Sequence, residues 1–185
     1  MSNIIKFHKV SFEQFYKDCL PQKRFVLTED SSDEVFKLYV RKLYDNIKLP
    51  QRGTKRSAGY DIMLPFNVTL EPGESILIPT GIRCEMTEQF NIVFMIFPRS
   101  SLGTKYRFIP CNLTGIIDAD YFNAKNEGHI MMKMVNDGDS KFFLASGSAF
   151  CQGVFLNYNT TYDDSVESER KGGFGSTDKE WLYEY

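Results

Sequence analysis

A short stretch in the middle of the chain gathers groups that bind phosphate. Pro98-Arg99-Ser100-Ser101-Leu102-Gly103 places one guanidinium and two hydroxyls in a turn that follows an apolar run. Turn amides, hydroxyl donors and an arginine fork can together hold a phosphate group. A serine-capped turn with a surface arginine is the more common explanation of such a stretch taken alone.

A second stretch, from Asn112 to Tyr121, brings two carboxylates to the end of an apolar run. Asp118 and Asp120 could serve as a general base and an ion partner. In a regular strand these two aspartates share one face, and Tyr121 points to the other. The alternative is a strand that simply runs into an acidic turn.

Near the C-terminus the chain reads RKGGFGSTD, from Arg170 to Asp178. Glycine loses more backbone freedom on ordering than any other residue, so this stretch should not hold one shape alone. It is either a solvated tail or an arm that orders over an anionic ligand. It is not a Walker A loop, which needs Gly-Lys-Ser/Thr between a strand and a helix.

The first fifty residues are predicted to be helical. Ser11-x-x-Gln14 and Ser31-x-x-Glu34 are capping-box patterns that start helices. The apolar residues that recur at helical spacing are Phe12, Phe15, Tyr16 and Cys19, then Val35, Leu38, Tyr39 and Leu43. We expect these faces to pack on the chain's own core, and a partner-binding surface is the alternative.

From Arg52 onward the pattern is that of β-strands. Short runs rich in Ile, Val, Phe and Met are separated by turn residues such as Glu71-Pro72-Gly73. The runs are Ser75–Pro79, Asn91–Phe97, Phe108–Leu113, Ile130–Val135 and Phe150–Tyr158. Short, evenly spaced strands without helical crossovers predict a sandwich or a closed barrel. The apolar content falls after Tyr162, where the folded body should end.

Composition limits the possible partners. A chain of 185 residues with 42% apolar residues can form one globular domain with a full core. The net charge of −2 gives no electrostatic footprint for broad nucleic-acid binding. The longest uncharged apolar run, Ile92–Pro98, is far shorter than the ~20 residues of a membrane span, so we expect a soluble, cytoplasmic protein.

Cysteine and histidine usage argues against a metal or disulfide framework. Cys19, Cys84, Cys111 and Cys151 are widely spaced and form no C-x-x-C pair, which favours reduced thiols. His8 and His129 are the only histidines, too few for a His-based zinc site.

Five stretches occur in an order that closely resembles the motifs of the trimeric dUTP diphosphatase (dUTPase) family. They are A-G-Y-D at Asp61, R-S-S-L-G at Arg99, N-x-x-G-I-I-D-x-D-Y at Asn112, G-x-x-x-x-Q ending at Gln152, and G-G-F-G-S-T around Phe174. Each motif is weak alone, but five in one order are highly specific.

The resemblance implies an all-β, distorted jelly-roll barrel over residues 49–162 and a flexible C-terminal arm over 163–185. It does not cover residues 1–48, which we expect to form a helical extension packed on the core. The implied activity is hydrolysis of dUTP to dUMP and pyrophosphate by attack of water on the α-phosphorus. That reaction limits uracil in DNA and supplies dUMP for thymidylate synthesis.

The resemblance assigns roles within the third motif. Asp118 matches the aspartate that orients and deprotonates the attacking water. Tyr121 matches the ring that packs on the deoxyribose and leaves no room for a 2′-hydroxyl. Because both must reach one pocket, the chain must turn or bulge after Asp118. Asn112 and the backbone from Gly115 to Ile117 match the hairpin that pairs with the uracil edge, where a tight pocket excludes the thymine methyl.

The resemblance also assigns the phosphate and metal contacts. Ser100, Ser101 and Gln152 match phosphate-binding positions, and Arg99 matches the arginine that steadies the aspartate and the phosphates. Asp61 matches an acidic residue near the water shell of Mg²⁺, which the three phosphates and waters should mainly hold.

The C-terminal arm should close over the substrate. Phe174 matches the ring that covers the uracil, followed by Gly175 and Ser176, and the arm's cations Arg170 and Lys171 match contacts to the outer phosphates. Such an arm stays open without substrate and closes on the triphosphate, which excludes bulk water. In this family the arm reaches another subunit's site, which implies a homotrimer.

The chain departs from the family pattern in several places. Ser148-Ala149 stands where the fourth motif usually has an acid–arginine pair. The third motif is longer than usual between Tyr121 and Gly128, and this loop should lie at the rim of the hairpin. Asp178 replaces the final motif glycine, and either Arg170 or Lys171 can meet the γ-phosphate.

Two alternative functions fit the same fold. A dCTP deaminase needs a glutamate on the strand after the third motif, and the strand Gly128–Met134 has none. A nucleotide-gated regulatory protein would bind a partner through the helical N-terminus or the long third-motif loop. The retained Asp118 argues against a purely non-catalytic role.

Overall fold

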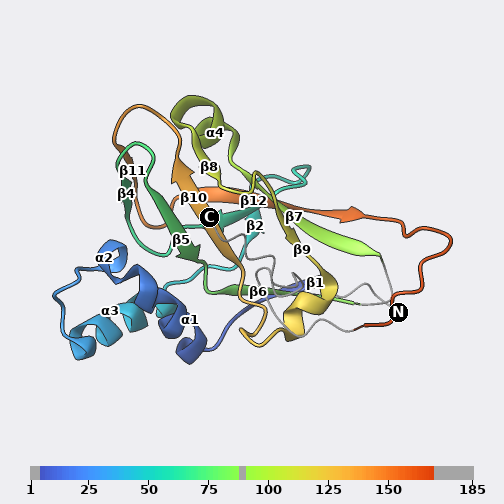
Figure 1. Cartoon of the computed structure of the whole chain (residues 1–185), viewed down its shortest axis with the longest axis horizontal. Helices are drawn as coiled ribbons and strands as arrows, with labels where there is room; N and C mark the ends of the chain where they lie inside the picture. Colours follow the sequence, from blue (N-terminus) through green and yellow to red (C-terminus); the bar gives the residue numbers. More distant parts are fainter. Residues whose placement is uncertain (1–4, 88–90, 169–185) are drawn as a thin grey trace, which may run out of the picture.

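The computed structural model describes residues 5–87 and 91–168 of the chain. Its body is built from short antiparallel strands, in agreement with the all-β expectation (Figure 1). In chain order they are β1 Ile5–Lys9, β2 Gln51–Arg52, β3 Tyr60–Met63, β4 Val68–Leu70, β5 Ser75–Pro79, β6 Ile82–Met86, β7 Ile92–Pro98, β8 Phe108–Pro110, β9 Gly115–Ile117, β10 Met131–Asn136, β11 Phe142–Leu144 and β12 Ala149–Asn157.

The strands form one large sheet and several small ones. The large sheet has the order β2-β3-β12-β7-β9, and a second sheet has the order β5-β10-β8. Two strand pairs, β4–β11 and β1–β6, complete the set. Buried and exposed residues alternate along β7 and β10, so one face of each sheet packs inward on a shared core.

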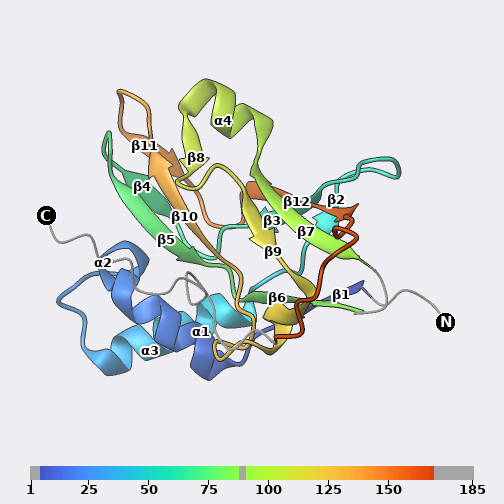
Figure 2. The same ribbon diagram turned by 45° about the vertical axis from the view of Figure 1, so that its right-hand side comes forward.

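The helices gather mainly at one end of the body. α1 (Phe12–Cys19), the 3₁₀ turn η1 (Leu20–Gln22), α2 (Lys23–Val26) and α3 (Asp33–Asp45) lie together beside β4 and β5 (Figures 1 and 2). Two further elements interrupt the strands, α4 (Ser100–Tyr106) and the 3₁₀ turn η2 (Ala119–Asn123). Among the described residues, every helix is too short or too polar to cross a membrane.

The first helix starts at the predicted cap. The Ser11 hydroxyl accepts a hydrogen bond from the Gln14 amide at 3.1 Å. The reciprocal half of the box is not made by Gln14, whose side chain donates to Asp18 instead. The carboxylate that accepts from the Ser11 amide is that of Glu127, at 2.7 Å. The predicted face is confirmed, because Phe12, Phe15 and Cys19 are buried.

The prediction for α3 is wrong in two respects. Ser32, not Ser31, caps the helix, and its hydroxyl accepts from the Val35 amide. Val35 and Leu38, predicted to face the core, are 53% and 67% exposed. The buried residues are Phe36 and Val40. Tyr39 and Leu43 are half-buried and pack against the core as predicted. The stripe that meets α1 therefore runs through Phe36, Tyr39, Val40 and Leu43.

The N-terminal extension is helical only in part. β1 pairs with β6 in an antiparallel register from Ile5–Met86 to Lys9–Ile82. Phe7 in β1 contacts the rings of Tyr60, Phe94 and Phe155, so this strand is part of the aromatic core. The extension is therefore joined to the barrel by a strand pair as well as by helix packing.

Gly153 lies where no side chain fits. A Cβ built there would stand 1.9 Å from Cζ of Phe94, which is fully buried and stacks on Phe155 at 4.6 Å between ring centroids. We expect Gly153→Ala to lower the free energy of unfolding by about 1–3 kcal/mol, because the packed ring must shift. Urea denaturation should show this loss, while Gly53→Ala, with no atom within 4 Å, should not. Equal stability of the two variants would contradict the packing argument.

Candidate active site

Neighbouring strands of the large sheet bring three predicted site residues together. Asp61 on β3 pairs in register with Gln152 on β12, and Gln152 pairs with Phe97 on β7. Arg99 follows β7 directly. The first, second and fourth motifs therefore meet at the same end of three adjacent strands.

Direct contacts hold this group in place. Arg99 donates from Nη1 to Oδ2 of Asp61 at 2.8 Å, and its backbone amide donates to the Phe150 carbonyl at 3.3 Å. A Cβ on Gly59 would lie 2.6 Å from Oε1 of Gln152, so the glycine of the first motif makes room for that side chain. Arg99 is thus braced by the acid of the first motif, and the guanidinium keeps part of its surface exposed.

Ser100 and Ser101 form the first turn of α4, with Arg99 as the N-terminal flanking residue. Both serines are exposed, while Leu102 anchors the helix in the core. Their amides and hydroxyls lie beside the Arg99–Asp61 pair along the chain. This is a surface on which phosphate oxygens could be bound.

The two strands of the third-motif hairpin belong to different sheets. β8 pairs with β10, whereas β9 pairs with β7 as the edge strand of the large sheet. Asn112 lies in the exposed turn between them, beside Leu113, whose φ is +64°. Gly115 is packed, because a Cβ there would lie 3.2 Å from Sδ of Met132. An edge strand offers backbone groups at fixed spacing, as pairing with a base edge requires.

The predicted turn after Asp118 is present. β9 ends at Ile117, and Asp118 has extended backbone geometry at the start of η2. Tyr121 lies in that turn and is 5% exposed. Its hydroxyl donates to the His129 carbonyl at 2.8 Å, so the far end of the ring is anchored inside the protein.

Asp118 and Arg99 lie at opposite ends of β7. Ile117 pairs with Phe94, and Arg99 is five residues further along, on the order of 16 Å at ~3.3 Å per residue. Figures 1 and 2 show the same separation, with α4 at one end of the body and the yellow turn η2 at the other. A single chain does not bring Asp118 to the group formed by Asp61, Arg99 and Gln152.

The last predicted site residues, Arg170, Lys171, Phe174, Gly175 and Ser176, lie outside the described residues. In the part of the chain that the structure describes, no three His, Cys, Asp or Glu side chains lie close enough together to hold a metal ion. One carboxylate oxygen of Asp61, Oδ2, already accepts a hydrogen bond from Arg99.

The cysteines are free thiols, as expected. Burial raises the pKa of Cys19 and Cys151 far above the usual range and that of Cys84 to about 12. Cys111 is exposed. A buried thiol with a raised pKa is a poor nucleophile, so Cys19, Cys84 and Cys151 are unsuited to catalysis.

Sequence reasoning missed a polar network that surrounds the third-motif loop. His129 was considered only as a zinc ligand, yet it is fully buried, with Nδ1 2.6 Å from Oδ2 of Asp18. The two residues are 111 positions apart, and no local pattern links them.

Known proteins resemble this chain over most of its length. The dUTPase family model matches residues 45–178. The deoxyuridine 5′-triphosphate nucleotidohydrolase of Lactococcus lactis is 41% identical over 134 residues, which cover 71% of this chain and 88% of that protein. The enzyme of the same name from Leptospira interrogans is 38% identical over 151 residues, covering 76% of this chain and 98% of that protein.

Solved structures give the same fold. The crystal structure of dUTPase from Streptococcus mutans has a TM-score of 0.58 and 29% identity, and covers 84% of this chain and 97% of that one. A Staphylococcus bacteriophage 80alpha dUTPase, at 19% identity, has a TM-score of 0.60 with 96% of each chain covered. The second likeness supports the fold alone. The chain therefore belongs to the dUTPase family.

Proposed function

We propose that this chain hydrolyses dUTP to dUMP and pyrophosphate, with Asp118 as the base that takes a proton from the attacking water. The observation that carries the proposal is the position of Asp118 in a chain that belongs to the dUTPase family. The aspartate follows the edge strand β9 directly and precedes the turn that holds Tyr121. Along the chain Asp118 thus falls between a strand edge suited to pairing with a base and a ring suited to packing on a sugar.

The phosphates would bind to the residues at the other end of β7, around Arg99 and Asp61. Ser100, Ser101 and Gln152 would bind the phosphate oxygens. Arg99 would neutralise the phosphate charge, and Asp61 would hold the Arg99 guanidinium in its orientation. Mg²⁺ bound to the triphosphate would offset charge that develops on the phosphate oxygens. Asp61 would contact that ion through its water shell.

The division of the site along β7 supports an assembly in which copies complete one another. Asp118 of one copy would face the Arg99–Asp61 group of a second, since one chain keeps them apart. A cyclic trimer repeats such a contact three times and closes. Residues 163–185 would supply the arm to a neighbouring site, with Phe174 over the uracil and Arg170 or Lys171 on the outer phosphates.

Isotope transfer from water tests the proposed chemistry. With dUTP and magnesium in ¹⁸O-enriched water, attack on the α-phosphorus places one ¹⁸O in dUMP and none in pyrophosphate. Mass spectrometry of the two products measures this directly. Label in pyrophosphate would mean attack on the β-phosphorus and would refute the proposed reaction.

A further inference from the structure

The segment that follows Tyr121, residues 122–129, folds back and holds the tyrosine side chain. The hydroxyl of Tyr121 donates to the His129 carbonyl and accepts from Nδ2 of Asn126, both at 2.8 Å. Gly128, with φ +66°, allows the return, because a Cβ there would lie 2.6 Å from the Tyr121 carbonyl oxygen. The orientation of the ring therefore depends on where the His129 carbonyl is held.

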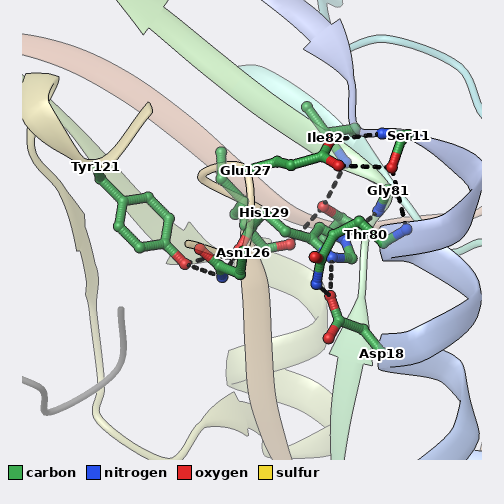
Figure 3. A network of polar contacts seen from close by, with 11 residues as sticks. Ser11, Asp18, Thr80, Gly81, Ile82, Tyr121, Asn126, Glu127 and His129 are labelled. Atoms are coloured by element: carbon green, nitrogen blue, oxygen red, sulfur yellow. Dashed lines mark hydrogen bonds and ion pairs between the residues drawn. The ribbon is translucent and has the colours of Figure 1, made fainter. Parts of the chain in front are cut away.

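The side chain of His129 is fixed at both ring nitrogens (Figure 3). The Gly81 amide donates to Nε2 at 2.7 Å, so Nε2 is the acceptor and Nδ1 carries the proton. Nδ1–H then donates to Oδ2 of Asp18, on α1, at 2.6 Å. Gln14, one turn earlier on the same helix, donates to the same oxygen at 2.7 Å.

A second contact ties the same loop to the start of α1. Glu127 accepts from the Ser11 amide at 2.7 Å and from the Ser11 hydroxyl at 2.6 Å. Burial alone would raise the pKa of Glu127, but the hydrogen bonds from Ser11 and the nearby Arg83 guanidinium hold that pKa below its ordinary value. At neutral pH Glu127 is thus an ionised acceptor for the helix cap.

We propose that the N-terminal helix α1 sets sugar selection, with Asp18 as a positioning residue that acts on Tyr121 through His129. The inference rests on the proposed role of Tyr121 against the deoxyribose. Residues 1–48 lie outside the family motifs, and the resemblance implies that the loop of residues 122–127 is longer than usual. Helix α1 would hold the loop of residues 122–127 in place. The Tyr121 ring would then stay in the space that a 2′-hydroxyl would need.

The test compares dUTP with UTP in the full-length protein. For each variant the readout is the ratio of kcat/KM for dUTP to kcat/KM for UTP. A loss of folded enzyme lowers both values equally and leaves the ratio unchanged, so a merely structural effect does not move it. Tyr121→Ala is the reference, and its ratio should fall roughly 10- to 200-fold as the pocket opens.

Asp18→Ala removes the hydrogen bond between His129 Nδ1 and Asp18, and Tyr121→Phe removes the one from the Tyr121 hydroxyl to the His129 carbonyl. The two variants interrupt one chain of contacts at its two ends. Each should lower the ratio roughly 2- to 10-fold, the worth of one hydrogen bond. Asp18→Asn should restore it, since its amide oxygen can still accept from Nδ1–H of His129. The double variant Asp18→Ala/Tyr121→Phe should be no worse than Tyr121→Phe alone, because the two residues act in one chain of contacts.

Glu13→Ala is the matched control, since it removes an exposed carboxylate from the same helix and should leave the ratio unchanged. If Asp18→Ala does not fold, Ser11→Gly takes its place. It removes the hydroxyl bond to Glu127 while glycine still serves as a cap, and it should also lower the ratio.

A relaxed ratio in Tyr121→Ala with unchanged ratios in Tyr121→Phe, Asp18→Ala and Ser11→Gly would overturn the role of α1 and leave the sugar pocket standing. An unchanged ratio in Tyr121→Ala would instead remove Tyr121 from the sugar pocket, and the inference would fall with it.

Discussion

Replacing Asp118 by asparagine should cut the turnover of dUTP by roughly 10²–10⁴-fold, the usual contribution of a positioned base. Folding and dUTP binding should remain nearly intact, because asparagine has the same shape and Asp118 lies at the start of a turn rather than in the core. The measurements are pyrophosphate release for turnover and titration with a non-hydrolysable dUTP analogue for affinity.

Asp120→Asn provides the matched control. It makes the same chemical change two residues away, at an exposed side chain in the same turn. Turnover close to that of the unmodified chain is expected for this variant. If Asp118→Asn kept full turnover and Asp120→Asn lost it, the base would be Asp120 and the assignment would be wrong.

Removing residues 169–185 should lower turnover on the order of 10²-fold, the scale of lost positioning in an active site. Without the arm nothing should close over the triphosphate, and bulk water should enter the site. The body should still fold, because the truncation keeps every strand and core residue that the structure describes. Pyrophosphate release measures the loss, and circular dichroism checks that the fold is kept.

Mixing two inactive chains tests whether the arm acts on a neighbouring copy. The truncated chain keeps Asp118, and full-length Asp118→Asn keeps the arm. In randomly mixed cyclic trimers about a quarter of the sites, one half times one half, would hold both parts. Turnover should therefore return to about a quarter of that of the unmodified protein. An arm that folds back on its own subunit would leave the mixture as inactive as its components.

Strand positions could be predicted closely from local pattern. Ser75–Pro79 is β5 without change, and Asn91–Phe97 and Phe150–Tyr158 each differ from β7 and β12 by one residue at each end. Alternating burial with turn residues between runs is a local property, so the sequence shows it. The run Phe108–Leu113 was too long, because the backbone leaves the strand after Pro110 to form the hairpin turn.

Features set by distant partners could not be predicted in the same way. Ile5–Lys9 mixes charged with apolar residues, and it becomes a strand because β6, more than 70 residues later, offers an edge. The face of α3 depends on α1, and apolar residues at Val35 and Leu38 gave the wrong phase. Adjacent Ser31 and Ser32 can both cap a helix, and only the backbone geometry selects Ser32.

The candidate site likewise has features that local sequence predicts and features that depend on distant partners. The order of the five motifs was enough to propose roles for Asp61, Arg99, Asp118 and Gln152, because a motif is a matter of residue type within a short stretch. The separation of Asp118 from Arg99 along β7 depends on register, which no motif encodes. The Asp18–His129 contact joins residues 111 positions apart and had no signal in the sequence.

The central claim is that the substrate is dUTP, and a pyrophosphate-release assay across dUTP, dCTP, dTTP and UTP with magnesium tests it most directly. A slot of backbone donors and acceptors should reject cytosine, a tight pocket should reject the thymine methyl, and Tyr121 should reject the ribose of UTP. Rapid release from dUTP and little release from the other three nucleotides are expected. Release from dCTP at a rate like that from dUTP would contradict the central claim.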